Sequence, residues 1–386
     1  MQPVLSSSEK APKLSLSGTP PPCMLLLSNG KTKHSRRSPL KAAVLEELEQ
    51  LTIVEKPDPV CGDDEVIIAP QAVSVCGSDV RIFHYGNDRV ETPTVIGHEV
   101  AGKVIEVGRN VSRFKEGDRI VMGADVPSEN CQWSLVGQGN LSERNYAIGY
   151  QFDGAFQQKM VLNDLTVKLG AVVKIPENLE YDQACIAEPL ACAIHGLELG
   201  QMGLGKSMCV IGLGPIGCMV LELSRYYGAG KVFAAQRSRG RLEMAKDFLP
   251  DARFICTEEE NLVDTIMAET DGEGVDFVIT TAGTVQAQAD AIQIVRKRGY
   301  VNLFAGLKNE PPLTIDSNLI HYREAFVMGT HGCNLPDVEK AVTLLAGGKI
   351  DARKYITKSF PLAEINDAFA FHESRQGLKV VVRPQD

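Results

Sequence analysis

The sequence predicts an α/β chain in which a small β-rich domain precedes a doubly wound parallel sheet. Three observations support this prediction. A glycine-rich turn joins an apolar strand to a helix within Met208–Ser224; strand and helix patterns then alternate to residue 304; and short strands separated by Gly and Pro turns fill residues 41–121. At 386 residues and 44% hydrophobic content, the chain is long enough to build two cores.

The glycine turn reads Gly212-Leu213-Gly214-Pro215-Ile216-Gly217. Gly212 permits the tight turn, Gly214 lets the backbone approach a pyrophosphate, and Gly217 lets the helix pack close to the strand with its N-terminal amides facing the phosphates. A glycine turn in some other α/β protein is the alternative. We favour a dinucleotide site because strands and helices follow at βαβ spacing: Lys231–Ala235, Arg241–Phe248, Arg253–Cys256, Leu262–Glu269, Val275–Thr280, Ala287–Arg298 and Tyr300–Phe304.

The end of the second strand decides which dinucleotide is favoured. An acidic residue there binds the ribose 2′-hydroxyl of NAD, whereas arginine suits the 2′-phosphate of NADP. Here Gln236 takes the acidic position, and Arg237, Arg239 and Arg241 follow before the first carboxylate at Glu243. We therefore predict NADP(H) over NAD(H), with a solvated arginine face at a helix start as the alternative.

Charge, hydropathy and cysteine content indicate which classes of partner and which compartment the protein has. The net charge is −9 without a basic stripe, which argues against nucleic acid, and no apolar run is long enough to span a bilayer. Ten cysteines without paired spacing indicate reduced thiols and a cytoplasmic protein. Residues 1–40 are rich in Ser, Pro, Lys and Arg, so we expect a disordered or leader extension whose removal (1–37) leaves activity and melting temperature unchanged.

Three separate loops carry a mixed set of metal ligands. Cys76 and Ser78 follow the strand expected at Glu65–Val73, His98 and Glu99 precede the strand at Gly102–Val107, and Glu188 lies far along the chain. Each residue alone has an ordinary structural explanation, as a small core thiol, a hydrogen-bonded imidazole or a solvated charge. Together, one thiolate, one imidazole and two carboxylates suit a catalytic Zn²⁺ site with a position left open.

These segments, with Gly117-Asp118-Arg119-Ile120-Val121 and the glycine turn, resemble the zinc-dependent medium-chain alcohol dehydrogenases, and among them the sorbitol or polyol dehydrogenase-like branch. The resemblance implies a GroES-like catalytic domain over 41–193, a Rossmann NADP-binding domain over 194–330, a return to the catalytic domain over 331–386, and a homodimer or homotetramer. By this resemblance, Cys76 and His98 are zinc ligands. Glu99 and Glu188 become the two acidic positions, either of which could be the direct third ligand.

The sequence departs from that family at a second metal site. Relatives with a structural zinc carry four closely spaced cysteines, whereas residues 126–134 and Ser142 here leave only Cys131. One thiolate cannot make a structural site. We therefore predict one zinc per chain and expect the lobe Gly123–Gly149 to be held by packing around Trp133.

The other departure affects proton transfer. Arg81 occupies the position at which many relatives place a relay histidine. Ser78 can still begin the relay through its hydroxyl, and His84 can complete it or be an ordinary surface histidine; otherwise the cofactor ribose passes the proton directly to water. Arg81 could also recognise an anionic substrate such as a sugar phosphate.

The resemblance implies hydride transfer between the nicotinamide and a secondary alcohol or ketone, with a polyol or sugar derivative as substrate. Zinc would polarise the substrate oxygen. Cys192, Phe304 and Ala305 would flank the nicotinamide. A threonine-type 3-hydroxy amino acid dehydrogenase, a non-catalytic dinucleotide-binding protein and a zinc-free quinone reductase are the alternatives, and the complete ligand set argues against the last two.

Overall fold

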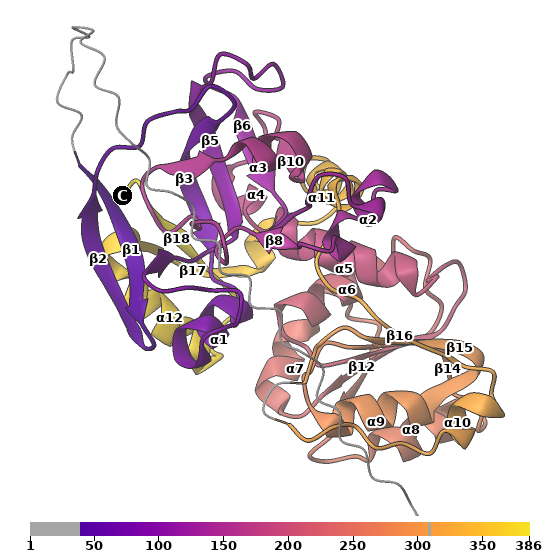
Figure 1. The fold of residues 1–386 in the computed structure, drawn as a ribbon. Coiled ribbons are helices and arrows are strands. Elements are labelled where there is room, and N and C mark those ends of the chain that lie inside the picture. Colours follow the sequence, from indigo (N-terminus) through magenta and orange to yellow (C-terminus); the bar gives the residue numbers. More distant parts are fainter. Residues whose placement is uncertain (1–38, 308–309) are drawn as a thin grey trace, which may run out of the picture. The chain divides into compact units, whose positions relative to one another are not determined.

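The computed structural model describes residues 39–307 and 310–386, so the expectations for residues 1–38 lie outside the described chain. Within the described residues, no helix is both long and apolar enough to cross a bilayer. The first element of the described chain is a strand that begins at Leu40, and Figure 1 follows the elements in order.

Two sheets build the first part of the fold, and their described strand pairs are antiparallel except for β17 (Ile356–Pro361) and β18 (Lys379–Arg383), which run parallel. A sheet of order β10-β6-β5-β3-β18-β17, with β9 also on β3, lies beside a smaller sheet of order β2-β1-β4. Their interior holds apolar side chains from both sheets and from α12. The elements of this part are β1 (Leu40–Glu47), β2 (Gln50–Lys56), β3 (Val66–Ser74), α1 (Gly77–Tyr85), β4 (Thr94–Val95), β5 (Glu99–Val107), β6 (Arg119–Met122), β7 (Asp125–Val126), α2 (Gln132–Leu135), β8 (Tyr146–Ala147), β9 (Met160–Leu162), α3 (Asp164–Leu169), β10 (Val172–Lys174) and α4 (Tyr181–Ala184).

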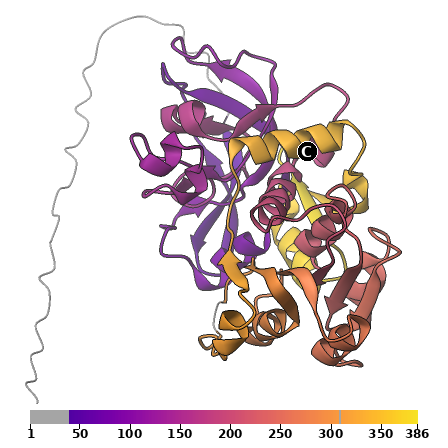
Figure 2. The same ribbon diagram turned by 90° about the vertical axis from the view of Figure 1, so that its right-hand side faces the viewer.

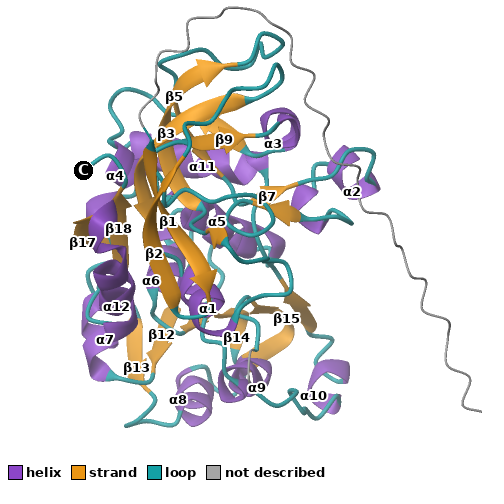
Figure 3. Ribbon diagram, turned by 60° about the vertical axis from the view of Figure 1, so that its left-hand side comes forward, coloured by secondary structure: helices purple, strands orange, loops and turns teal. Residues whose placement is uncertain are grey.

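A six-stranded parallel sheet of order β13-β12-β11-β14-β15-β16 forms the second part, with helices on both faces (Figure 3). This confirms the doubly wound sheet. Its elements, with the helix that leads into it, are α5 (Ala187–Leu199), β11 (Met208–Ile211), α6 (Pro215–Ser224), β12 (Val232–Gln236), α7 (Arg239–Ala245), β13 (Arg253–Cys256), α8 (Leu262–Glu269), β14 (Val275–Thr280), α9 (Val285–Ile294), β15 (Val295–Leu303), α10 (Asn318–His321) and β16 (Phe326–Gly329).

The central strand β11 explains why both faces of this sheet need helices. Successive side chains of a strand point to opposite faces. Met208 and Val210 belong to one core cluster, whereas Cys209 and Ile211 belong to another, and all four are buried. A strand that is apolar at every position presents hydrophobic side chains on both faces of the sheet. Helices must therefore cover both faces to bury them.

The C-terminal segment returns to the first sheet. It comprises α11 (Leu335–Ala346), β17 (Ile356–Pro361), α12 (Ile365–Ser374) and β18 (Lys379–Arg383). Val381 and Val382 of β18 pair with Ser74 and Val73 of β3, so the last strand lies against one of the first, as Figures 1 and 2 allow the reader to follow. This pairing brings Lys379 to the end of β3, where the metal-ligand loops begin.

Three local expectations are corrected by the structure. The helix expected over Ala287–Arg298 ends at Ile294, because the chain enters β15 at Val295 and Arg298 adopts a positive φ of 57°. Strand β2 was not anticipated between Leu45 and the Pro57 turn. Trp133 is 37% exposed, so it does not form the core of the lobe 123–149.

Packing of Val126 and Ile148 in the first core holds that lobe together with hydrogen bonds. The Ser142 hydroxyl accepts the Ser128 N–H at 2.9 Å and lies 2.8 Å from the Ser128 hydroxyl. The buried Cys131 sulfur accepts the Glu143 N–H at 3.4 Å. Backbone N–H groups around this sulfur, that of Glu143 first, favour the thiolate and lower the pKa of Cys131 to about 7.

Candidate active site

Cys76 lies at the N-cap of α1, directly after β3. Its backbone N–H donates to Asp79 Oδ2 at 2.9 Å, which closes the first turn of the helix as a capping box. The Ser78 hydroxyl donates to Cys76 Sγ at 3.2 Å. The cap therefore fixes the thiol where strand passes into helix, with the positive end of the helix dipole beside it.

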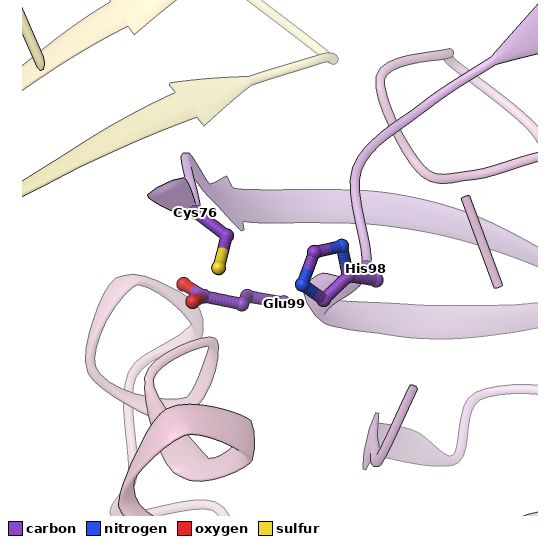
Figure 4. A group of neighbouring side chains, drawn as sticks. All are labelled: Cys76, His98 and Glu99. Carbon is purple, nitrogen blue, oxygen red and sulfur yellow. The ribbon is translucent and has the colours of Figure 1, made fainter. Parts of the chain in front are cut away.

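His98 and Glu99 come from the start of β5, the neighbour of β3 in the sheet. Cys76, His98 and Glu99 each offer one ligand atom, and these three atoms lie within 4.8 Å of one another. Figure 4 shows the thiol, the imidazole and the carboxylate gathered at this point. The structure thus brings together three of the four expected ligands.

The Asp79 carboxylate lies beside the His98 ring. Asp79 Oδ1 lies 3.1 Å from His98 Nδ1, while His98 Nε2 lies 3.4 Å from the Ser78 hydroxyl. Burial disfavours the charged ring, but Asp79 and Cys76 outweigh it and raise the pKa of His98 well above its ordinary value. A carboxylate on one ring nitrogen leaves the other aimed at the ligand cluster, as in metal-binding histidines generally.

Glu99 is held by a buried ion pair that the sequence analysis did not anticipate. Lys379 Nζ donates to both Glu99 carboxylate oxygens at 2.5 Å, and the Ser74 hydroxyl donates to Oε2. The two charged side chains are 3% and 1% exposed. Burial works against the ammonium, but Glu99 outweighs it and raises the pKa of Lys379. Lys379 therefore neutralises Glu99 and fixes its direction.

Glu188 forms a second cluster rather than joining the first. It begins α5, where Cys192 lies one helical turn further on, and Cys333 reaches both from the loop before α11. The ligand atoms of these three buried residues lie within 4.8 Å of one another. Burial raises the pKa of Glu188 to about 7, with the charge of Glu99 adding to the rise and that of His98 opposing it. Glu188 thus interacts electrostatically with the first cluster.

The residues of the first cluster fit a zinc ion by their chemistry. A thiol, an imidazole whose far nitrogen faces a carboxylate, and a buried carboxylate form a donor set that zinc accepts. Three donors leave the fourth position of a tetrahedral zinc for a small molecule, and Glu188 stays a predicted ligand. The soft thiolate favours zinc over magnesium or calcium.

The glycine turn has the geometry expected of a phosphate site. Gly212 has a φ of 101°, and a Cβ on Gly217 would lie 2.0 Å from the Gly212 carbonyl oxygen. Only glycine fits at either position. Helix α6 begins with Pro215 and Ile216 after the N-cap Gly214, so its free N–H groups point into the space above the turn.

The side chains at the end of β12 have three different surroundings. Gln236 Oε1 accepts the Leu213 N–H at 2.8 Å, which ties it to the glycine turn. Arg239 forms a two-pronged ion pair with Glu259, and Arg237 Nε lies 3.7 Å from Glu258. Arg241 forms no ion pair with any described residue, and its guanidinium would lie 3.8 Å from a Cβ on Gly214. Arg241 is therefore a cation beside the turn.

Phe304 and Ala305 follow β15. A Cβ on Gly196 of α5 would lie 3.2 Å from the Phe304 ring, and the Ala305 N–H donates to the Thr280 carbonyl at 2.9 Å. These contacts place the end of β15 against α5, the helix that carries Glu188.

His84 lies in a different environment from the other expected site residues. Its Nδ1 is 2.7 Å from Glu49 Oε1 and its Nε2 is 2.6 Å from Glu373 Oε1. These two hydrogen bonds, that of Glu49 first, raise the pKa of His84. Both ring nitrogens are engaged, which favours the expected alternative of an ordinary surface histidine over the relay role of His84.

Five residues of this region escaped the sequence analysis as site residues: Ser74, Asp79, Tyr150, Cys333 and Lys379. A signal existed for Lys379, since it is a charge at the start of the apolar run Val380–Val382, and for Asp79, three residues after a potential N-cap. Tyr150, whose ring centroid lies 5.9 Å from that of His98, and Cys333 come from loops that the sequence does not align with the ligands.

Two family models match this chain: the alcohol dehydrogenase GroES-like domain over residues 62–177 and the zinc-binding dehydrogenase domain over residues 215–347. The L-threonine 3-dehydrogenase of Caldanaerobacter subterraneus subsp. tengcongensis is 31% identical over 86% of this chain and 95% of its own. The sorbitol dehydrogenase of Bacillus subtilis is 30% identical over 91% and 99%, respectively.

Among solved structures, a Sinorhizobium meliloti 1021 protein bound to NADP is similar to this chain, with a TM-score of 0.83 and 26% identity over 90% of this chain and all of its own. The chain thus combines a GroES-like domain with a Rossmann domain. It belongs to the zinc-dependent alcohol dehydrogenase family, in its polyol dehydrogenase branch, and is a dehydrogenase acting on CH–OH groups.

Proposed function

We propose that this chain transfers hydride between NADP(H) and the secondary alcohol or ketone group of a polyol or sugar derivative, with one zinc per chain. The observation that carries the proposal is the cluster of partly buried Cys76 with buried His98 and Glu99, beside which the Ser78 hydroxyl lies. When bound, the zinc would act as a Lewis acid on the substrate oxygen.

The chain's own residues prepare that chemistry. Cys76 and His98 would hold the metal, and Asp79 fixes the ring of His98 in its ligating orientation. Ser78, within hydrogen-bond reach of Cys76, can take a proton from the substrate hydroxyl and pass it on. Glu188, with a pKa of about 7, can hold or release a proton near neutral pH.

The preference for NADP rests on the end of β12. Gln236 is neutral, so it does not repel a 2′-phosphate, and Arg241 near the glycine turn offers charge-assisted donors. Arg237 and Arg239 can contribute if they leave Glu258 and Glu259. The ratio of kcat/KM for NADP to that for NAD tests this. We expect at least about tenfold in favour of NADP, which corresponds to 1.4 kcal/mol of discrimination; a tenfold preference for NAD contradicts it.

A matched variant sharpens the coenzyme test. Gln236→Glu keeps an oxygen that can accept the Leu213 N–H but adds the carboxylate that selects the ribose hydroxyls of NAD. We expect the ratio to shift toward NAD by about tenfold or more. An unchanged ratio would show that Gln236 does not face the ribose.

A threonine-type dehydrogenase is the second candidate, because the L-threonine 3-dehydrogenase above matches this chain as well as the sorbitol dehydrogenase does. Reduction of ketoses, inososes, sugar phosphates and simple ketones by NADPH, compared with oxidation of threonine, separates the two. Turnover of a polyol or ketose supports the proposal, whereas oxidation of threonine without turnover of any polyol replaces it.

The proposal also includes a cytoplasmic location and a dimer or tetramer. Light scattering measures the oligomeric state.

A further inference from the structure

Glu188, Cys192 and Cys333 form a compact donor cluster that the dehydrogenase chemistry does not require as a set. Two thiols and one carboxylate, all buried, place their ligand atoms within 4.8 Å of one another. They come from two elements that pack together: α5 carries Glu188 and Cys192, and Cys333 lies just before α11, which contacts α5.

The geometry of this cluster matches a tetrahedral soft-metal site. Zn–S and Zn–O bonds of about 2.3 and 2.0 Å at a tetrahedral angle place the two ligand atoms about 3.5 Å apart. The Cys192 thiol donates to Glu188 Oε1 across 3.4 Å. The pair is therefore already at the separation that coordination requires, with a proton between them where a cation would lie.

The third donor is fixed by its surroundings. Cys333 is 2% exposed, its backbone N–H hydrogen bonds to the buried Asp125 carboxylate, and Gly123 leaves space for the sulfur, since a Cβ there would lie 3.1 Å from Cys333 Sγ. Its thiol also hydrogen bonds with that of Cys192. A preorganised pair of thiols beside a carboxylate requires little rearrangement to close on an ion.

We propose that Glu188, Cys192 and Cys333 form a second, soft-cation site that takes Zn²⁺ or Cd²⁺ when these ions are in excess. On binding, both thiols release their protons to solvent, two metal–sulfur bonds form, and no electron is transferred. Thiolate-rich donor sets select such ions over Mg²⁺ and Ca²⁺. A consequence that rests on the proposed function is inhibition, because an ion on Cys192 occupies the side on which the nicotinamide is expected.

Uptake of Cd²⁺ by the reduced full-length protein tests the site directly. Equilibrium dialysis counts the ions per chain, and the ultraviolet cadmium–thiolate charge-transfer band reports sulfur ligation. We expect wild type to take up one more ion per chain than Cys333→Ser. The affinity of the variant for that ion should fall by at least about 100-fold, since even outer partners of metal ligands contribute 10- to 100-fold.

Three further variants keep this test independent of folding and of the proposed function. Cys192→Ser removes the other thiol from a different element and should lose the same ion, whereas Cys209→Ser, buried in β11, should bind as wild type. Cys76→Ser should lose only the first site. Equal Cd²⁺ uptake and affinity in wild type, Cys333→Ser and Cys192→Ser overturns the inference, whatever happens at Cys76.

Discussion

The ion pair between Lys379 and Glu99 predicts a large loss of stability when the ammonium is removed. With Nζ 2.5 Å from the carboxylate oxygens, and an effective dielectric constant of about 20, the attraction is about 6 to 7 kcal/mol. Desolvation of the two groups offsets part of it. Lys379→Met leaves the 1%-exposed Glu99 carboxylate unpaired, so we expect the free energy of unfolding to fall by about 3–5 kcal/mol.

The assay is urea denaturation of metal-free protein, because a bound cation would compensate Glu99 in place of Lys379. The matched control is the double variant Lys379→Met/Glu99→Gln, which removes both charges. We expect it to be more stable than Lys379→Met by at least about 1 kcal/mol, since no buried charge is left unpaired. A loss below about 1 kcal/mol in the single variant, or no recovery in the double variant, would refute this reasoning.

Three further predictions follow from the contacts around the site and the lobe. Asp79→Asn still accepts the Cys76 N–H but no longer offers a carboxylate to His98, so zinc affinity measured by chelator competition should fall about 10- to 100-fold; an unchanged affinity contradicts the positioning role. His84→Gln should change kcat by less than about threefold, because Glu49 and Glu373 occupy both ring nitrogens. If His84 relayed the proton, the same substitution would lower kcat by about 100-fold or more. The pKa of Cys131 is about 7 in the folded chain, below the ordinary thiol value. The Cys131 thiolate therefore adds to the stability of the fold above about pH 8.5, and this contribution is lost as the pH falls through 7. The melting temperature of wild type relative to Cys131→Ser should therefore decline from about pH 9 to about pH 6, and a constant difference would show that the thiolate is not stabilised by the fold.

The parallel sheet could be predicted closely because its signals are local. Met208–Ile211 is apolar at every position and is followed by glycines, so both the strand and its end can be read from the sequence. The strand expected from Tyr300 is present, but the end of the preceding helix could not be placed, since Arg296, Lys297 and Arg298 are consecutive charges and Val295 enters the strand by pairing with β14.

In the site, too, residues within local motifs could be predicted from the sequence, and contacts between distant segments could not. The predicted ligands Cys76, His98 and Glu99 lie in or next to loops with recognisable motifs, whereas Lys379, which pairs with Glu99, comes from a distant segment. Lys379 lies 280 positions from Glu99 and reaches it only because β18 pairs with β3. Glu188 was expected beside the other ligands, but its packing with Cys192 and Cys333 depends on how α11 lies on α5, which no spacing in the sequence encodes.

The most direct test of the proposed function is zinc content measured together with NADPH-dependent turnover on one sample. We expect about one resident zinc per chain, loss of turnover on chelation and recovery when zinc is returned. Cys76→Ala should lack both the metal and the activity, while Cys209→Ala, remote from the cluster, should keep both. A protein that turns over its substrate at full rate without zinc, or a Cys76→Ala variant that retains metal and activity, would contradict the assignment of this cluster as the catalytic centre.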